Sequence, residues 1–143
     1  MNPSIAADVI KPRASILSWH AHVYYDPART RAGAETLHQR IAERFAVQMG
    51  RWHDVPVGPH TAAMYQVAFA TEQFAAFVPW LMLNRDGLDV LVHPNTLAPR
   101  DDHLHHALWL GHVLPLREDV LPLRIDAADE SPVLPNTAPG VGA

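Results

Sequence analysis

The order in which strand-like and helix-like segments follow one another limits the folds open to this chain of 143 residues. Four segments are predicted as strands from their alternating apolar residues or their β-branched and aromatic content: 16–25, 51–57, 61–69 and 88–92. Two segments have apolar residues at helical spacing: 26–49 and 71–83. The predicted order is therefore βαββαβ.

This order is that of an α+β, ferredoxin-like sandwich, in which one antiparallel sheet carries both helices on the same face. The other face is left open, so a partner subunit, the C-terminal tail or a ligand must cover it. We expect Asp26 to cap the first helix and Pro27 to occupy its first turn, with Gly50 ending it. Thr71 is expected to cap the second helix, and Pro79 to kink it.

The length is that of one ordinary domain, so we predict a single domain over 1–143 with an ordered core over about 14–125. The first dozen residues are expected to be a loose end, and the Pro- and Gly-rich segment 131–143 a flexible tail. A domain of this size buries about 70% of its unfolded surface and needs no disulfide to fold.

Composition excludes several classes of function. The net charge of −4 argues against nucleic acid or an anionic membrane as the main partner. There is no cysteine, which excludes disulfides, thiolate catalysis and Cys-ligated metal centres. Neither a signal peptide nor an apolar run of membrane-spanning length is visible, so a cytoplasmic location is expected.

The chain contains ten histidines, and strand parity predicts where three of them lie. Side chains alternate across a strand, so the apolar set of 19, 21, 23 and 25 faces the helices and leaves His20 and His22 on the open face. In the last predicted strand Val90 and Val92 face the helices, so Leu91 and His93 join His20 and His22 on the open face. His20, His22 and His93 are therefore expected to converge.

Two further histidines can approach this group: His60, at the entry to the third strand, and His103, after the last strand. Three or four such donors from separate segments can bind a metal ion. The alternative is that the strand histidines are only polar surface. His38 and His53 are interpreted as surface residues, and three others can either extend the site or lie at its rim: His105, His106 and His112.

At these residues the sequence resembles a known family. Segment 19–26 matches the His-X-His-X-Tyr-aromatic-Asp motif of the DOPA 4,5-dioxygenase family. Further blocks match in the same order: 58–60, 80–85, 90–96, 102–103 and 107–111. The resemblance covers about 18–111.

The resemblance implies a small dimeric enzyme that opens the ring of a catechol such as DOPA beside its hydroxyls, in the manner of extradiol dioxygenases using non-haem Fe(II). Zinc or another divalent metal is a second candidate in a purified sample. The family's histidines map onto five positions: His20, His22, His60, His93 and His103.

For the roles implied by this resemblance, His22 and His93 are the first choice as metal ligands, with His20 or His103 as the third. We assign the metal to His20, His22 and His93, and acid–base catalysis to His60 and His103. A carboxylate ligand from Asp26, Asp89 or Asp102 stays open, as does orientation of a histidine by Asp102.

Two other functions use the same histidines. The first is a non-catalytic, dimeric module that binds a metal or a small aromatic ligand on the open face. The second is a structural cluster buried in a dimer interface. The sequence leaves open which catechol is used, which metal is bound in the cell and whether the tail covers the site.

Overall fold

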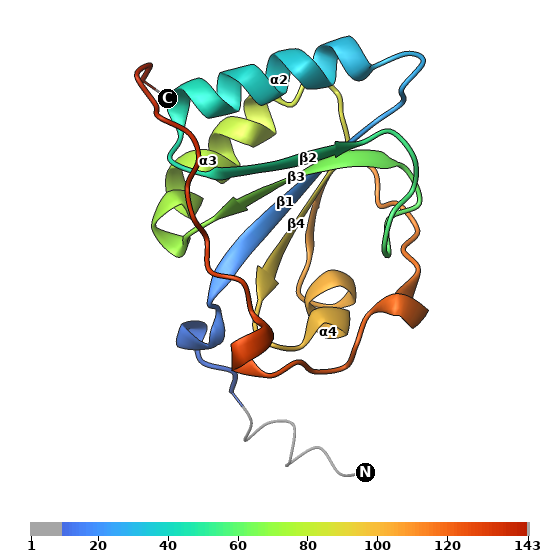
Figure 1. Ribbon diagram of the computed structural model, residues 1–143, viewed down its shortest axis with the longest axis vertical. Helices are drawn as coiled ribbons and strands as arrows, with labels where there is room; N and C mark the ends of the chain where they lie inside the picture. Colours follow the sequence, from blue (N-terminus) through green and yellow to red (C-terminus); the bar gives the residue numbers. More distant parts are fainter. Residues whose placement is uncertain (1–9, 143) are drawn as a thin grey trace.

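The computed structural model describes residues 10–142 and contains an open, five-stranded antiparallel sheet (Figure 1). The strand order is β2-β3-β1-β4-β5. The strands are β1 Ser18–Tyr25, β2 Gln48–His53, β3 Ala63–Phe69, β4 Val90–Asn95 and β5 Leu108–Leu110. The α-helices are α2 Arg31–Arg44, α3 Thr71–Asn84 and α4 Pro99–Leu104, and the 3₁₀ turns are η1 Arg13–Ser15, η2 Glu118–Val120 and η3 Ala127–Asp129.

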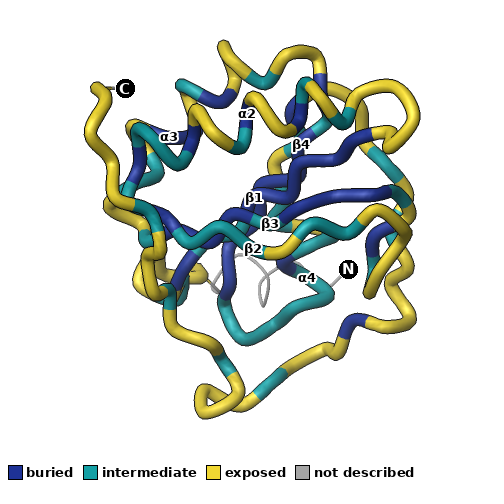
Figure 2. Tube along the Cα trace, turned by 45° about the horizontal axis from the view of Figure 1, so that its top comes forward, coloured by how far each residue is buried: buried dark blue, intermediate teal, exposed yellow. Residues whose placement is uncertain are grey.

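Helices α2 and α3 lie on one face of the sheet and α4 on the other (Figure 2). The main core lies between the sheet and the first two helices, where strand residues such as Val23, Val67 and Val92 pack with Leu37 and Phe77. This arrangement confirms the α+β, ferredoxin-like fold. No helix among residues 10–142 is both long and apolar enough to cross a membrane.

The expected side-chain parity is confirmed in the central strands. Ala21 and Val23 are fully buried on the helix face. On the opposite face Tyr24, Met64 and Leu91 form a second, smaller apolar cluster. The open face therefore carries apolar packing of its own beside the histidines.

The predicted limits of the first helix are wrong at both ends. Asp26 closes a turn by accepting a hydrogen bond from the Ala28 amide, and α2 begins only at Arg31. It ends at Arg44, because the buried Phe45 adopts an extended conformation. Gly50 lies inside β2, where an added Cβ would stand 3.0 Å from the Gln66 carbonyl oxygen.

Other limits also differ. The strand expected at 51–57 occupies Gln48–His53, and β4 continues past 92 to Asn95, which places His93 inside the strand. Thr71 is the first residue of α3 and not its cap; its hydroxyl accepts a hydrogen bond from the Trp19 indole. Pro79 lies within α3 without dividing it.

One α-helix and one strand, α4 and β5, were not predicted, nor were the 3₁₀ turns, because each is too short to show a hydrophobic period. Beyond β5 the chain returns across the open face. Leu121 is buried, and its carbonyl accepts a hydrogen bond from the Arg100 side chain, which ties this segment to α4. The open face is therefore covered in part by the protein's own chain.

The C-terminal segment runs beside β2 (Figure 1). Asn136 exchanges side-chain hydrogen bonds with both the amide and the carbonyl of Met49. The Thr137 hydroxyl accepts a hydrogen bond from the Val47 amide and lies within donating distance of the Phe45 and Val47 carbonyls. These contacts satisfy part of an otherwise exposed sheet edge. The single domain and the flexible tail remain predictions; residues 1–9 of the expected loose N-terminal end, and Ala143, lie outside the described residues.

Candidate functional site

Five histidines from separate parts of the chain meet on the face opposite α2 and α3. We call them the histidine cluster: His20 and His22 of β1, His60 before β3, His93 of β4 and His103 of α4. The ring centroids of His93 and His103 lie 3.9 Å apart, and those of His22 and His60 lie 4.2 Å apart. The structure therefore brings together every histidine that the sequence singled out as a site residue.

Strand pairing accounts for three members of the cluster. β1 and β4 are antiparallel neighbours, and His20 stands directly opposite His93. His22 follows two residues later on the same face of β1. The Nε2 atoms of His22 and His93 are 3.1 Å apart. Parity and register together are sufficient to assemble this part of the cluster.

Loop contacts place His60. It forms an isolated antiparallel bridge with Leu116. The same pairing continues through the Arg117 amide, which donates to the Pro59 carbonyl, and the Thr61 hydroxyl, which donates to Pro115. The segment that follows β5 therefore holds His60 against the sheet.

Hydrogen bonds at the Nδ1 atoms orient two of the rings. His93 Nδ1 bonds to the Pro94 carbonyl at 2.9 Å, and His103 Nδ1 bonds to the Pro99 carbonyl at 2.7 Å. A carbonyl only accepts, so these Nδ1 atoms carry the proton and each Nε2 keeps its lone pair. A metal-binding histidine commonly has this support from its second nitrogen.

The cluster is held in its uncharged form. Burial, and to a lesser degree the neighbouring histidines, lower the pKa of His20 and of His60 to about 4. The pKa values of His22 and His93 lie well below the usual range for the same two reasons. Neutral imidazoles with free lone pairs are the form that binds metal ions.

The geometry fits a metal ion. Two groups of three ligand atoms lie within 4.8 Å of one another: His20, His22 and His93, and His22, His60 and His103. Two nitrogens bound to one ion at about 2.1 Å are roughly 3.0 to 3.4 Å apart, which matches the His22–His93 contact. His22 Nδ1 is buried and has no hydrogen-bond partner in the described part of the chain. If His22 binds the ion through Nε2, its Nδ1 carries the ring proton, so no hydrogen bond at Nδ1 fixes this ring as it does those of His93 and His103.

The three candidate carboxylates are engaged elsewhere, and no Asp or Glu of residues 10–142 belongs to either group. Asp26 closes the turn before α2, and Asp89 accepts bonds from the amide and ring of His112. Asp102 bonds to Thr96 and His106. In both groups the atoms that could bind a metal ion are therefore all imidazole nitrogens.

The other histidines lie outside the cluster. His38 was interpreted as a surface residue but is half-buried on the helix face, where its ring packs against Trp52 and Tyr65. His53 ends β2, His105 is exposed, and His112 is an exposed partner of Asp89. His106 points into a separate cavity, which is described below.

Sequence reasoning assigned no role to Tyr24, although its parity places it on the cluster's face. Its hydroxyl lies 2.7 Å from His60 Nδ1, and its ring stacks on Trp109. Burial raises the pKa of Tyr24, so the phenol stays protonated. A hydroxyl can donate or accept, and His60 can therefore hold its proton on either nitrogen.

Replacing Tyr24 with phenylalanine tests this contact. Tyr24→Phe is expected to cost about 1 kcal/mol of unfolding free energy and to slow the activity proposed below about tenfold, with an altered pH–rate profile. Tyr25→Phe is the matched control, because the Tyr25 hydroxyl bonds to Asp54, away from the cluster. An unchanged pH profile in Tyr24→Phe would show that this hydroxyl only supports the fold.

Comparison with known proteins gives a family from the sequence and a similar fold from a solved structure. The profile of the Dopa 4,5-dioxygenase family matches residues 19–120. The DOPA 4,5-dioxygenase of Amanita muscaria is 33% identical over 121 residues, which are 79% of this chain and 53% of that protein. An uncharacterized 21.2 kDa protein of Botryotinia fuckeliana is 42% identical over 92 residues, 58% of this chain and 50% of that protein.

A crystal structure from Nostoc punctiforme, of a protein provisionally described as a dioxygenase, superimposes with a TM-score of 0.76. It is 49% identical in sequence, and the match covers 78% of this chain and 96% of that one. The chain spans about half the length of the two curated relatives.

Proposed function

Because the chain belongs to the Dopa 4,5-dioxygenase family, we propose that it is a metal-dependent, extradiol-type dioxygenase acting on a small catechol such as DOPA. In this reaction the ring C–C bond beside the hydroxyls breaks and both atoms of dioxygen enter the product, so no external reductant is needed. The observation that carries the proposal is the cluster of five neutral histidines on the open face of the sheet.

His20, His22 and His93 would hold the metal, for which we propose Fe(II), with zinc as a second candidate in purified protein. When bound, Fe(II) supplies a redox-active centre with positions for the catechol and dioxygen. The support is geometric: β1 and β4 present these rings side by side, and the lone pair on His93 Nε2 is oriented by the bond at Nδ1.

His60 and His103 are proposed as the acid–base residues. A neutral imidazole can accept the second phenolic proton of the catechol, and both rings have a lowered pKa caused chiefly by burial. The two rings differ in tautomer. His103 keeps a lone pair on Nε2, whereas the Tyr24 contact lets His60 Nε2 either accept or donate a proton. Either ring can take up the phenolic proton at Nε2 and return that same proton to the product, so the protein ends the cycle in its starting protonation state.

The second possible metal-binding group, His22, His60 and His103, makes these roles testable. If His20, His22 and His93 hold the metal, His20→Ala lowers the bound metal while His103→Ala retains it and loses turnover. The opposite pattern would assign the metal to His22, His60 and His103. Metal content per folded protein is the readout that separates ligands from acid–base residues.

The whole protein is tested by purifying it without a His-tag, measuring its metals, and adding Fe(II) and a panel of catechols before admitting air. We expect stoichiometric iron and a new visible absorbance that appears only with oxygen. Bound metal without an oxygen-dependent product would favour a non-catalytic module that binds a metal or an aromatic ligand. A homodimer, to be checked by sedimentation, and a cytoplasmic location are further parts of the proposal.

A further inference from the structure

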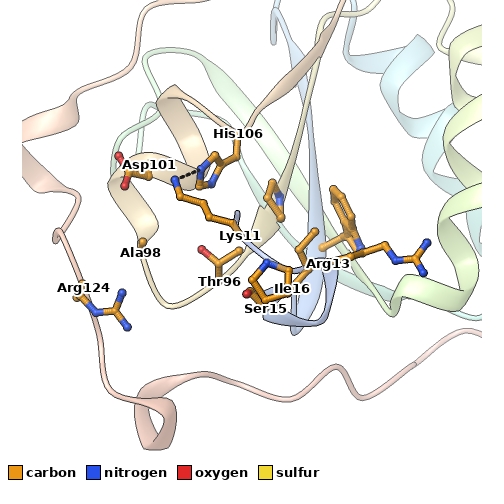
Figure 3. Close-up of a pocket in the computed structure, with 12 residues that line it drawn as sticks. Lys11, Arg13, Ser15, Ile16, Thr96, Ala98, Asp101, His106 and Arg124 are labelled. Carbon is orange, nitrogen blue, oxygen red and sulfur yellow. Dashed lines mark hydrogen bonds between the residues drawn. The ribbon is translucent and has the colours of Figure 1, made fainter. Parts of the chain in front are cut away.

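A second candidate site lies in a cavity of about 480 Å³ between the N-terminal segment of the described chain and the loop that follows β4 (Figure 3). Its walls come from η1 and its flanking residues, β1 and β4, the loop after β4, α4 and the residues that follow it, and Arg124. None of the five cluster histidines lines it. The cavity is therefore distinct from the proposed metal site, although α4 contributes to both.

Positive charge dominates this cavity. Lys11, Arg13 and Arg124 line it, against a single carboxylate, that of Asp101, among the described lining residues. Arg13 and Arg124 lie at opposite ends, and Lys11 lies between them (Figure 3). The chain as a whole has a net charge of −4, so this local excess is not a general property of its surface.

A hydrogen-bonded chain holds the polar wall in place. Lys11 Nζ donates to His106 Nε2 at 3.2 Å (Figure 3). His106 Nδ1 in turn donates to the Asp102 carboxylate at 2.9 Å. The Asp102 side chain is only 2% exposed. Lys11 uses one of its three N–H groups in this contact, which leaves two for a ligand.

The adjoining loop is held in a strained conformation. Asp102 also accepts hydrogen bonds from the amide and the hydroxyl of Thr96, which lines the cavity. The next residue, Leu97, has a φ of 72°, which is rare for a residue with a branched side chain. Such strain persists only where surrounding contacts enforce it, and it is typical of ligand sites. The buried Asp102 carboxylate thus fixes Thr96 and His106 in this wall before a ligand binds.

The remaining walls are apolar, through Ile16, Trp19 and Pro94. Few polar groups set in an apolar lining of several hundred Å³ are typical of small-molecule sites. We propose that this cavity binds a small organic carboxylate with an apolar body, at a site separate from the histidine cluster. The proposal does not depend on the reaction that the cluster catalyses.

Calorimetric titration with benzoate tests the proposal, with benzamide as its neutral analogue and inorganic phosphate as an anion without an apolar body. We expect benzoate to bind once per chain, and at least about tenfold more tightly than either of the others. The same benzoate affinity is expected for the purified protein and after chelation, because the cluster is not involved.

Single variants locate the site. Lys11→Met and Arg124→Gln are each expected to weaken benzoate binding about tenfold or more, because each removes a charged hydrogen-bond donor. Arg117→Gln is the control, since Arg117 lies outside the cavity beside Asp119. The proposal is overturned if benzoate does not bind, if both cavity variants bind it as the parent does, if phosphate binds equally well, or if binding needs the metal.

Discussion

Replacement of His93 by alanine is expected to remove the bound metal and to reduce ring-opening activity by more than about a hundredfold. His93 is fully buried, stands opposite His20 and lies 3.1 Å from His22 through their Nε2 atoms. Its loss removes one metal-ligand atom and leaves His22 Nε2 without its neighbouring nitrogen. Metal analysis and oxygen-dependent turnover are the measurements.

Two controls separate this role from a loss of folding. His38→Ala removes another partly buried histidine, on the helix face, and should keep both metal and turnover. His93→Gln retains a polar side chain of similar size, so a folded variant that still lacks metal would confirm the ligand role. A His93→Ala protein with full activity and normal metal content would contradict it.

Acidification of the metal-depleted protein is expected to lower its unfolding free energy steeply between about pH 6.5 and 4. In the unfolded chain each histidine takes up a proton near pH 6.5, whereas the folded cluster resists protonation until about pH 4 at His20 and His60. The unfolded state therefore binds more protons in this interval and gains stability. The folded protein therefore has its full free energy of unfolding above about pH 6.5 and loses part of it as the pH falls toward 4.

One histidine shifted in this way contributes about 3 kcal/mol over the interval. Urea unfolding at a series of pH values measures it, and His20→Gln should flatten the dependence. His112→Gln is the matched control, because that ring is 87% exposed and lies outside the cluster. Stability that stays level from pH 7 to 4.5 would show that the cluster is hydrated and readily protonated.

Much of the site was predictable because it rests on local periodicity. The two-residue repeat of a strand assigns His20 and His22 to one face whatever the rest of the chain does. The βαββαβ order then makes β1 and β4 neighbours, which brings His93 to the same place. The sequence determined this part through short-range geometry and a topology that few folds share.

The tertiary structure alone decided the rest. His60 is placed by pairing with Leu116, far along the chain, and the first helix ends early because Phe45 is extended and buried. The orientation of each imidazole, the lowered pKa values and the cavity beside η1 depend on which distant groups share a buried volume. Periodicity reports only a residue's own element, whereas burial and hydrogen-bond partners follow from how elements pack.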